Sequence, residues 1–439
     1  MKILFLENRY KTRLYELVAE HLLKNEHEIH FLVQNHDFKP SKRFVNHLIK
    51  YPNSSYKKTK DPYHIDKVIE SDRQINHFQA NDNSYFYYYD EKIYKSLKDI
   101  KPDIVFGEST AFHELITIEN CKKLDIPYLN PCTCRYPTGR FSFYKYETLV
   151  PFKGSNKELE DGEALKIINQ IVEKTAKPDY MKIKPKSKKE ILIDNLKKLT
   201  GYVKGERYNT PHPLVKLSLE KKKNKRIEIW DFLSEEILSK SKEIKILYPL
   251  QMQPEANIDV WGRKFRNQTE LIETIVSNLP EDCVLYVKPN PKSNYELNNQ
   301  LLNFVEKSDQ VRSLSHSAKM EDIIHEVDLV ITVTGTIAIE CILSNKPVIS
   351  LVKNLNNDSS NCYHVQDLEK DLIKFIDILK KKDWDVINQK EKINFINQIN
   401  RTSYKGIISD PFTNINCIAD NNIQELTLAF NDVILEYEN

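Results

Sequence analysis

The residues of this sequence best suited to chemistry follow apolar runs, at points where a buried strand would reach the protein surface. The clearest run, DLVITV, ends at Val333 and is followed by Thr334, Gly335 and Thr336, after which helical spacing begins. The start of a helix binds anions through its free N–H groups and its dipole. The pattern therefore predicts a site for a nucleotide phosphate at these three residues. The alternative is a plain strand–turn–helix connection with a threonine cap.

Two further groups could contact the sugar part of such a ligand. Glu340 lies one helical turn beyond Thr336, from where it could reach a ribose or sugar hydroxyl. The segment LYPLQMQPEANID includes the end of another apolar run and carries Gln251, Gln253 and Glu255, with Pro249 and Pro254 stiffening the backbone. We interpret it as a rigid loop that presents carboxamides and a carboxylate to a sugar. An ordinary polar loop after a strand is the alternative.

A carboxylate in the first third of the chain is a candidate general base. In VFGESTAFHE an apolar run ends at Gly107, and Glu108 follows directly. A carboxylate at the tip of a strand could deprotonate an acceptor hydroxyl. Alternatively, Glu108 could cap the helix that begins near Thr110. His113 and Glu114 lie one turn further on; His113 is a candidate acceptor-binding residue, although a histidine there is often structural.

Basic side chains add two candidate anion contacts. Arg135 and Arg140 alternate with aromatic residues in TCRYPTGRFSFY, which suits a sugar or carboxylate surface, or a loop packed by its own aromatic rings. Lys288 ends the apolar run CVLYVK and could neutralise a phosphate or a sugar carboxylate. As a solvated lysine at the end of a strand it would have no function.

Composition excludes several other classes. The chain has 439 residues, of which 40% are hydrophobic and 29% charged, with 65 basic and 63 acidic residues and a net charge of +2. A dedicated nucleic-acid binder usually has a clear basic excess. No GxGxxG or Walker sequence occurs, which disfavours dinucleotide dehydrogenases and P-loop kinases. No apolar run approaches the ~20 residues of a membrane-spanning helix, and MKILFLEN reads as a buried strand rather than a secretory signal.

The seven cysteines predict neither a zinc site nor a disulfide framework. The one close pair is Cys132 and Cys134, and no second pair completes a metal site. Several of the others lie in apolar runs, where a reduced, buried thiol is expected. We therefore predict a cytoplasmic protein without metal or other cofactor.

Strands alternate with helices in two blocks, which predicts the α/β class with parallel sheets. The first block contains KILFLE, EIHFLV, DIVFG and IPYLN, with a helix from about 111 to 124. Between about 40 and 95 the pattern weakens into Tyr-, Asn- and Lys-rich segments, which we interpret as loops. The second block runs from IKILYPL through CVLYVK, VRSL and DLVITV to PVISLV.

The blocks suggest three parts of the chain. Residues 1–240 would form an acceptor-side Rossmann-like domain with a Lys-rich helical connector, residues 241–365 a second Rossmann-like domain that binds a nucleotide sugar, and residues 366–439 helices that pack back across the cleft. Two doubly wound domains with a helical C-terminal tail are the layout of GT-B-like folds. Ligands of such sheets bind outside the carboxyl ends of the strands.

The segments quoted above, in their order along most of the chain, resemble the capsule polysaccharide biosynthesis family, whose members include transferases of Kdo (3-deoxy-manno-octulosonic acid) from CMP-Kdo. The resemblance implies a GT-B fold, with the nucleotide sugar on the C-terminal domain and the acceptor on the N-terminal one. It is strongest in YPLQMQPEANID, in the segment from NQTELIETIV to VKPNP, in DLVITVTGTIAIECILSNKPVIS, and in the stretch from GESTAFHE to LDIPYLNPCTCRYPTGRFSFY. The positions that match are Glu108, Gln253, Glu255, Lys288, Gly335, Thr336 and Glu340.

One departure concerns the donor. Where relatives look like VKEHP, this chain has VKPNP, so that Asn290 replaces a histidine expected to contact the donor phosphate. This leaves room for a donor other than CMP-Kdo. The expected partners are a nucleotide sugar, CMP-linked by preference, and a glycan or glycolipid acceptor, with no nucleic acid. The basic stretches 182–189 and 221–226 could contact the inner membrane peripherally, or form solvated helix faces.

Three other functions fit the same pattern. A sugar-nucleotide epimerase shares the fold and the TGT-like turn but needs no acceptor. A teichoic-acid-type polyol phosphotransferase would move a polyol phosphate. An inactive glycan-binding partner in a capsule assembly complex would do neither. Glycosyl transfer accounts best for the combination of a phosphate site, a polar sugar loop and a separate carboxylate.

Overall fold

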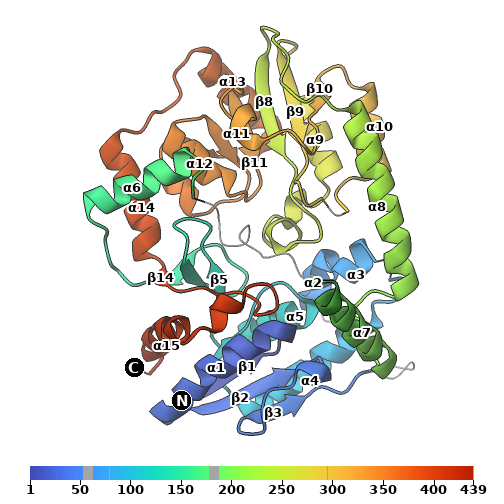
Figure 1. The fold of residues 1–439 in the computed structure, drawn as a ribbon, viewed down its shortest axis with the longest axis vertical. Coiled ribbons are helices and arrows are strands. Elements are labelled where there is room, and N and C mark those ends of the chain that lie inside the picture. Colours follow the sequence, from blue (N-terminus) through green and yellow to red (C-terminus); the bar gives the residue numbers. More distant parts are fainter. Residues whose placement is uncertain (53–62, 79, 177–186, 294, 439) are drawn as a thin grey trace. The chain divides into compact units, whose positions relative to one another are not determined.

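The computed structural model describes residues 1–52, 63–78, 80–176, 187–293 and 295–438 (Figure 1). The chain forms two compact units. Unit 1 combines Met1–Leu159, Lys177–Val215 and Asn397–Asn439, and unit 2 combines Glu160–Ala176 with Lys216–Ile396. Each unit therefore contains segments that are distant in sequence. The division into 1–240, 241–365 and 366–439 stays a prediction.

Unit 1 is built on a mixed sheet whose strand order is β14-β6-β5-β4-β1-β2-β3, with β7 paired to β6. The pairs among β1 to β5 are parallel, and β6 runs antiparallel to its neighbours. The central strands are short apolar runs, because both of their faces are covered. The strands are β1 (Lys2–Leu6), β2 (Glu28–Val33), β3 (Val45–Leu48), β4 (Ile104–Phe106), β5 (Tyr128–Thr133), β6 (Arg140–Lys145), β7 (Pro151–Lys153) and β14 (Tyr404–Lys405).

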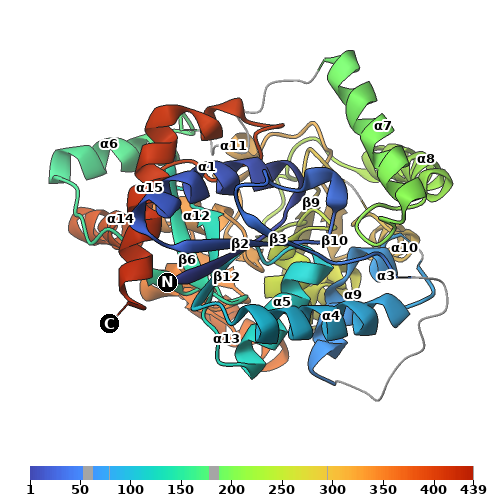
Figure 2. The same cartoon turned by 90° about the horizontal axis from the view of Figure 1, so that it is seen from below.

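Helices cover both faces of this sheet. Figure 2 shows α1 and α15 on one side and α4 and α5 on the other. The buried side chains Leu14, Val18, Leu426, Phe430 and Val433 join α1 and α15 to the strands in one core. The helices of unit 1 are α1 (Thr12–Leu22), α2 (Asp66–Ser71), α3 (Arg73–Asn76), α4 (Ser84–Ile100), α5 (Phe112–Lys123), α7 (Lys188–Lys204) and α15 (Asp420–Leu435), with 3-10 turns at Arg9–Lys11, Leu23–Asn25, His36–Phe38, Tyr63–Ile65 and Ile415–Ile418.

The interpretation of residues 40–95 as loops is wrong for β3, α2, α3 and α4. In α4 the side chains of Phe86, Tyr89, Ile93, Leu97 and Ile100 are buried. Their spacing of three or four residues puts them on one helix face. Tyrosines supply part of that face, so the Tyr- and Asn-rich composition hid the helical period. Residues 53–62 of the same region lie outside the described residues.

Unit 2 contains a parallel sheet with the strand order β10-β9-β8-β11-β12-β13. The predicted strands of the second block are present, and the apolar run at Asp328–Val333 lies in a different sheet from DIVFG. The chain adds β9 and β10 on one side of β8 and then β11, β12 and β13 on the other side, so the sheet is doubly wound. Its strands are β8 (Ile244–Pro249), β9 (Cys283–Lys288), β10 (Val311–Ser313), β11 (Leu329–Thr332), β12 (Val348–Ser350) and β13 (Cys362–His364).

The core of unit 2 joins these strands to surrounding helices. Trp230, Ile272, Leu301 and Leu372 are buried in it together with strand residues, and helix α6 packs against α12. The remaining elements are α6 (Asp161–Val172), α8 (Pro213–Leu233), α9 (Gln268–Ser277), α10 (Asn299–Lys307), α11 (Met320–Ile323), α12 (Ile337–Ser344), α13 (Leu368–Lys380), α14 (Gln389–Arg401), a π-helical turn at Asn257–Trp261 and 3-10 turns at Arg263–Phe265 and Leu355–Asp358.

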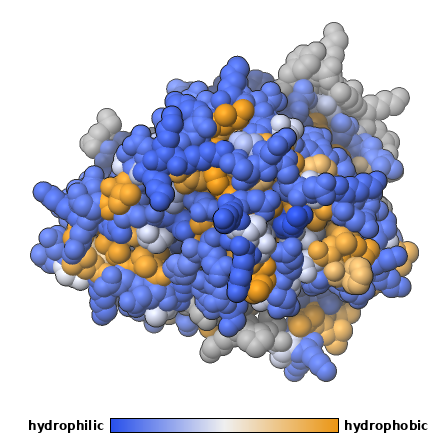
Figure 3. Space-filling view, turned by 90° about the horizontal axis from the view of Figure 1, so that it is seen from above, coloured by the Kyte–Doolittle hydropathy of each residue, from blue (hydrophilic) through white to orange (hydrophobic). Residues whose placement is uncertain are grey.

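The C-terminal segment returns to unit 1. Strand β14 pairs with β6, and α15 packs against α1. The predicted fold class, α/β with two doubly wound, Rossmann-like sheets and C-terminal helices in the GT-B-like manner, is confirmed. On the face drawn in Figure 3, hydrophobic side chains gather in small patches on a largely hydrophilic surface. Among the described helices, none is both long and apolar enough to cross a bilayer.

Candidate functional site

Glu108 lies at the point of unit 1 where the strand order reverses. The chain passes from β1 to β2 on one side and later to β4 on the other, so the carboxyl ends of β1 and β4 flank this point. Asn8 follows β1, and its Nδ2 donates to Glu108 Oε2 at 2.9 Å. Lys11 forms an ion pair with the same carboxylate. Ligands of doubly wound sheets bind at such switch points, and the Glu108 side chain keeps 18% of its surface exposed.

Glu114, rather than Glu108, caps helix α5. Its Oε2 accepts from the backbone N–H groups of Thr110 (3.1 Å) and Ala111 (2.8 Å). Its Oε1 accepts from Asn8 Nδ2 at 2.7 Å. The helix start therefore does not need the Glu108 carboxylate. The alternative that Glu108 caps this helix therefore loses its main support. Glu114, which does cap the helix, is fully buried.

A second buried glutamate braces the ends of β1 and β2. The carboxylate of Glu7 accepts from the backbone N–H groups of Arg9 (2.6 Å) and Asn35 (2.7 Å). Burial raises the pKa of Glu7, opposed by the nearby His113. The sequence signal was its position directly after a strand, the same as that of Glu108. Its bonds to two backbone amides indicate that it shapes the edge of the sheet.

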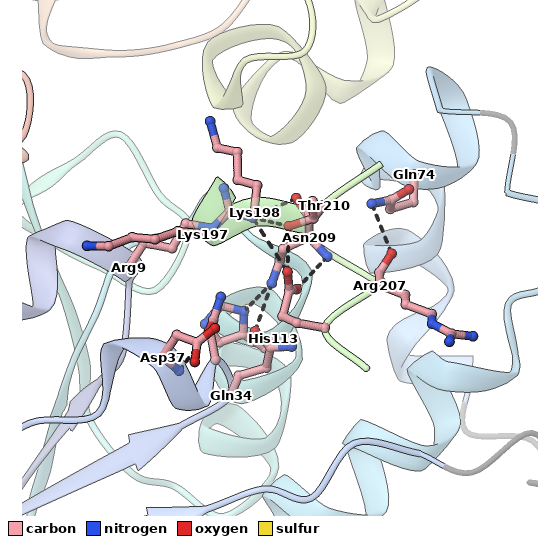
Figure 4. Close-up of polar contacts among 12 residues, drawn as sticks. Arg9, Gln34, Asp37, Gln74, His113, Lys197, Lys198, Arg207, Asn209 and Thr210 are labelled. Atoms are coloured by element: carbon pink, nitrogen blue, oxygen red, sulfur yellow. Dashed lines mark hydrogen bonds and ion pairs between the residues drawn. The ribbon is translucent and has the colours of Figure 1, made fainter. Parts of the chain in front are cut away.

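His113 is held inside a buried network (Figure 4). Its Nε2 faces the carbonyl oxygen of Glu7 at 2.9 Å, and its Nδ1 lies 3.4 Å from Nδ2 of Asn209. The Asn209 amide also donates to Gln34 Oε1 at 3.1 Å. Both ring nitrogens have protein partners, so the geometry favours the structural alternative over acceptor binding. Asn209 comes from the connector, which the sequence did not associate with this site.

A cavity of about 200 Å³ opens beside the ends of β1 and β2. Arg9 crosses it and donates to Asn209 O (2.9 Å) and Thr210 Oγ1 (2.8 Å). Tyr10 and Phe412 stack in its wall with ring centroids 4.5 Å apart. The cavity thus combines charged groups with aromatic rings, and α7 contributes part of its lining.

The two predicted acceptor-binding arginines have different surroundings. Arg135 is half-buried and lies just after β5, at the same edge of the sheet as Glu108. Arg140 donates from Nε to Ser403 Oγ (2.7 Å) and from NH2 to the carbonyl oxygens of Asn400 and Ser403 (2.8 Å each). Arg140 therefore fixes the C-terminal segment to β6. The neighbouring Phe141 and Phe143 are core residues of this strand and line no sugar surface.

In unit 2 the predicted polar residues also gather at the switch point, between β8 and β11. The Gln251 side-chain amide lies 3.1 Å from the hydroxyl of Thr334, which donates to Asn257 O at 3.0 Å. Gly335 donates its N–H to Thr332 Oγ1 at 3.0 Å. A Cβ at Gly335 would lie 2.4 Å from that oxygen. Glycine is therefore required for the packing of this turn, and its N–H is not available to an anion.

Thr336 and Glu340, both half-buried, are the remaining predicted donor contacts of this segment. Helix α12 begins directly after Thr336, as predicted, and the Thr336 side chain makes no cap hydrogen bond, unlike the alternative of a threonine cap. Glu340 forms an ion pair within unit 2 with Lys174, which lies in the turn after α6. Burial lowers the pKa of Lys174. The structure therefore gives the Glu340 carboxylate a protein partner, which a ribose hydroxyl would have to share.

Gln253 organises the loop after β8. Its Nε2 donates to Asp259 Oδ1 (2.7 Å) and to Arg266 O (2.9 Å), and its Oε1 accepts from Gln268 at 3.0 Å. The side chain is buried, so its amide serves the loop. Glu255 is half-buried and donates its backbone N–H to Asp259 Oδ2 at 3.0 Å.

Lys288 is buried at the end of β9, which sets it apart from a solvated lysine. Its Nζ has long contacts with the carbonyl oxygens of Pro289 (3.4 Å) and Ser315 (3.5 Å). Burial lowers its pKa, because desolvation disfavours the ammonium, while the charge of Asp231 opposes that shift.

Beside Lys288 lies a chain of side chains that the sequence did not reveal. Asp231 Oδ1 lies 2.8 Å from His316 Nδ1, and His316 Nε2 lies 3.0 Å from Ser293 Oγ. The Ser293 hydroxyl donates to Asn290 O at 2.9 Å. These residues come from α8, the loop after β9 and the loop after β10. More than 60 residues separate Asp231 from Ser293 in the sequence, so no local motif could predict that these side chains meet.

No metal centre is recognisable in the described part of the chain. There, no three His, Cys, Asp or Glu side chains gather closely enough to hold an ion. The cysteines are free thiols. Cys134 lies 3.3 Å from Ser142 Oγ, and burial raises its pKa to about 11.

Comparison with known proteins adds a family and some distant structures. Residues 163–355 match the family described as capsule polysaccharide biosynthesis protein. That range covers α6, α8 and most of the unit 2 sheet, with both the Gln251–Thr334 and the Lys288–His316 groups. No curated protein matches the chain in sequence.

Solved structures resemble the chain only remotely. The UDP-GlcNAc 2-epimerase of Methanocaldococcus jannaschii is 14% identical, with 91% of this chain and 99% of that one covered and a TM-score of 0.28. KpsC of Thermosulfurimonas dismutans, a beta Kdo 2,4 transferase, is 11% identical over 67% and 79%, with a TM-score of 0.31. MurG of Acinetobacter baumannii is 10% identical over 98% and 99%, with a TM-score of 0.25. These likenesses are too distant for an activity to carry over.

Proposed function

We propose, from the premise that residues 163–355 belong to the capsule polysaccharide biosynthesis protein family, that this chain is a glycosyltransferase. It moves a sugar from a nucleotide-activated donor to a capsule or other surface-glycan acceptor. The observation that carries the proposal is the group formed by Lys288, His316 and Ser293 at the ends of β9 and β10, inside the matched range. Such a group suits the phosphate of a nucleotide sugar.

The chemistry of this group matches a phosphate that becomes a leaving group. An ammonium removed from water interacts strongly with an anion, because the surrounding medium screens it weakly. Asp231 orients the His316 ring through Nδ1, so that Nε2 faces the Ser293 hydroxyl. Lys288 would bind the departing phosphate oxygen as negative charge grows on it. His316, whose side chain is 13% exposed whereas His113 is buried, would exchange the Ser293 hydroxyl for the same oxygen. The turn at Thr334–Thr336 and the Gln251 amide would hold the rest of the donor.

Glu108 is the candidate base for the acceptor. In a single displacement its carboxylate takes the proton of an acceptor hydroxyl, the hydroxyl oxygen attacks the anomeric carbon, and the bond from that carbon to the phosphate oxygen breaks. The nucleotide leaves with the bonding electron pair. Asn8 and Lys11 fix the carboxylate at the switch point of unit 1. Glu255 is the second candidate and lies in the loop after β8.

A CMP-linked acidic sugar such as Kdo is the donor we favour, with the reaction in the cytoplasm. The resemblance to Kdo transferases suggested it, and Asn290 in place of a histidine argued against it. His316 supplies an imidazole two hydrogen bonds away, since Ser293 links it to the backbone of Asn290. We therefore expect His316 to contact the donor phosphate in place of the histidine that relatives have at the position of Asn290.

The test is turnover of a donor panel by the purified chain. CMP-Kdo, CMP-sialic acids, CDP-glycerol, UDP-sugars and GDP-sugars are incubated with it separately, and released nucleotide is measured by mass spectrometry. We expect release of CMP from an acidic-sugar donor. Release of CMP with transfer of glycerol phosphate would indicate a polyol phosphotransferase, and binding without release throughout the panel would indicate an inactive glycan-binding protein.

A further inference from the structure

Helix α7 presents its apolar side chains to solvent. Leu192, Leu196, Leu199 and Val203 are spaced by four, three and four residues, so they lie on one helix face. Their exposed fractions are 59%, 52%, 47% and 72%. An amphipathic helix on a globular domain normally turns such a face toward the core. In α7 the usual orientation is reversed.

The opposite face of α7 holds the helix to unit 1. Tyr10 Oη donates to Asp194 Oδ1 at 3.1 Å, and Lys204 Nζ donates to Asp37 Oδ1 at 2.6 Å. Gly201 is buried, and a Cβ there would lie 3.4 Å from Asp37. These polar contacts fix which face points outward. The exposure of the leucines is therefore a property of how α7 docks.

Charge on α7 is distributed unevenly around the apolar face. Lys188 and Lys189 are exposed beside its N-terminal end, whereas Lys197 lies on the docking side, with its ammonium 5.3 Å from the centre of the Tyr10 ring. The acidic residues are turned toward other partners: Glu190 accepts from Ser187 in the capping box, and Asp194 accepts from Tyr10. The N-terminal end of the exposed apolar strip is thus bordered by cations. A strip of this kind complements a surface that is apolar inside and anionic outside.

We propose that α7 docks this protein onto a bilayer that contains anionic lipid. The leucines and Val203 enter the boundary between headgroups and acyl chains, and the lysines bind lipid phosphates while their stems lie along the apolar face. A second copy of the chain would cover the leucines too, but would bring two sets of lysines together. The proposal does not rest on glycosyl transfer, since it concerns binding to lipid alone.

The test is co-sedimentation of the full chain with vesicles. We expect binding to vesicles of phosphatidylcholine mixed with phosphatidylglycerol, weakening as salt is added, and little binding to phosphatidylcholine alone. Replacing Leu196→Glu and Leu199→Glu together should weaken binding at least about tenfold, because two carboxylates would enter the interface. The control is Leu428→Glu on α15, an even more exposed leucine (67%) outside α7, which should bind as the wild type does.

Three results would overturn the proposal. One is a wild-type chain that does not bind the anionic vesicles. Another is a double variant that binds as well as the Leu428→Glu control. The third is a dimer in sedimentation equilibrium that the double variant dissociates, because a second copy would then cover the leucines. Donor turnover is measured on the same samples, so a failure of lipid binding and a failure of the proposed transfer are seen separately.

Discussion

The side-chain amide of Asn8 and the carboxylate of Glu108 are joined by a 2.9 Å hydrogen bond at the adjacent ends of β1 and β4. Asn8 also donates to the capping residue Glu114. Its amide therefore lies between the two carboxylates and gives each of them a hydrogen bond. One carboxylate stabilises a helix, and the other stays at the edge of the sheet with part of its surface open. This division of roles makes Glu108 the better candidate base.

Glu108→Gln should lower turnover by roughly 10²–10⁴-fold, the range typical of a positioned base. The substitution keeps the size and hydrogen bonding of the side chain and removes its charge. Donor affinity, measured by calorimetry, should be nearly unchanged, since the proposed donor contacts lie in unit 2. Normal turnover in this variant would shift the assignment to Glu255.

Glu114→Gln is the matched control for that variant. It removes charge from the cap of α5, where a carboxylate is stabilising. We expect a loss of about 1 kcal/mol in the free energy of unfolding and turnover within a few-fold of wild type. If Glu114→Gln and Glu108→Gln lose activity equally, the effect of Glu108 is structural.

Lys288→Met and His316→Gln should each weaken nucleotide binding about 10–100-fold, because each removes a contact of about 1.5–3 kcal/mol with a charged phosphate. Calorimetric titration with CMP measures this, after circular dichroism has shown that both variants fold. Lys292→Met, a nearby exposed lysine, is the control and should bind normally. If all three variants bind CMP with equal affinity, the phosphate does not bind at this site.

Arg140→Met should lower the free energy of unfolding by about 2–4 kcal/mol, since its guanidinium bonds to Asn400 and Ser403 would be lost. Denaturant titration followed by tryptophan fluorescence or circular dichroism measures the loss. Below the unfolding transition, donor affinity should be that of the wild type. A variant of normal stability with a raised KM for the acceptor would restore the predicted acceptor-binding role.

Asp72→Asn should change how stability depends on pH. Burial raises the pKa of Asp72 to about 6, so the folded chain binds this proton more tightly than the unfolded one. The stabilisation is therefore complete below about pH 4 and is lost as the pH rises through about 6. Relative to the variant, the wild type should gain about 1–3 kcal/mol from pH 7 to pH 4. Parallel stability curves for the two proteins would contradict this assignment.

Local patterns were sufficient for most of the strands and for the polar groups at their ends. Runs such as CVLYVK coincide with β9, and Asn267 caps α9 as its spacing with Glu270 predicted. Because the carboxyl ends of parallel strands meet at one edge, Gln251 and Thr334 were expected near one another and lie in contact. Helix α4 was missed because its buried face is built from tyrosines as well as aliphatic residues.

Contacts between distant segments could not be read from the sequence. Asp231, Ser293 and His316 are unremarkable where they stand and form a chain only because α8 packs beside β9 and β10. Lys174 and Glu340 form an ion pair although they are 166 positions apart in the sequence. Arg140 looked like a ligand contact because guanidinium groups suit both carboxylates and backbone carbonyls, and only the fold shows which partner is present.

The most direct measurement is the mass of the acceptor after incubation of the wild-type chain with a nucleotide sugar and a capsule oligosaccharide. Glycosyl transfer predicts a product heavier by one sugar residue and an equal amount of free nucleotide, both strongly reduced in Glu108→Gln and Lys288→Met. An unchanged acceptor with an isomerised nucleotide sugar would contradict the account and indicate an epimerase.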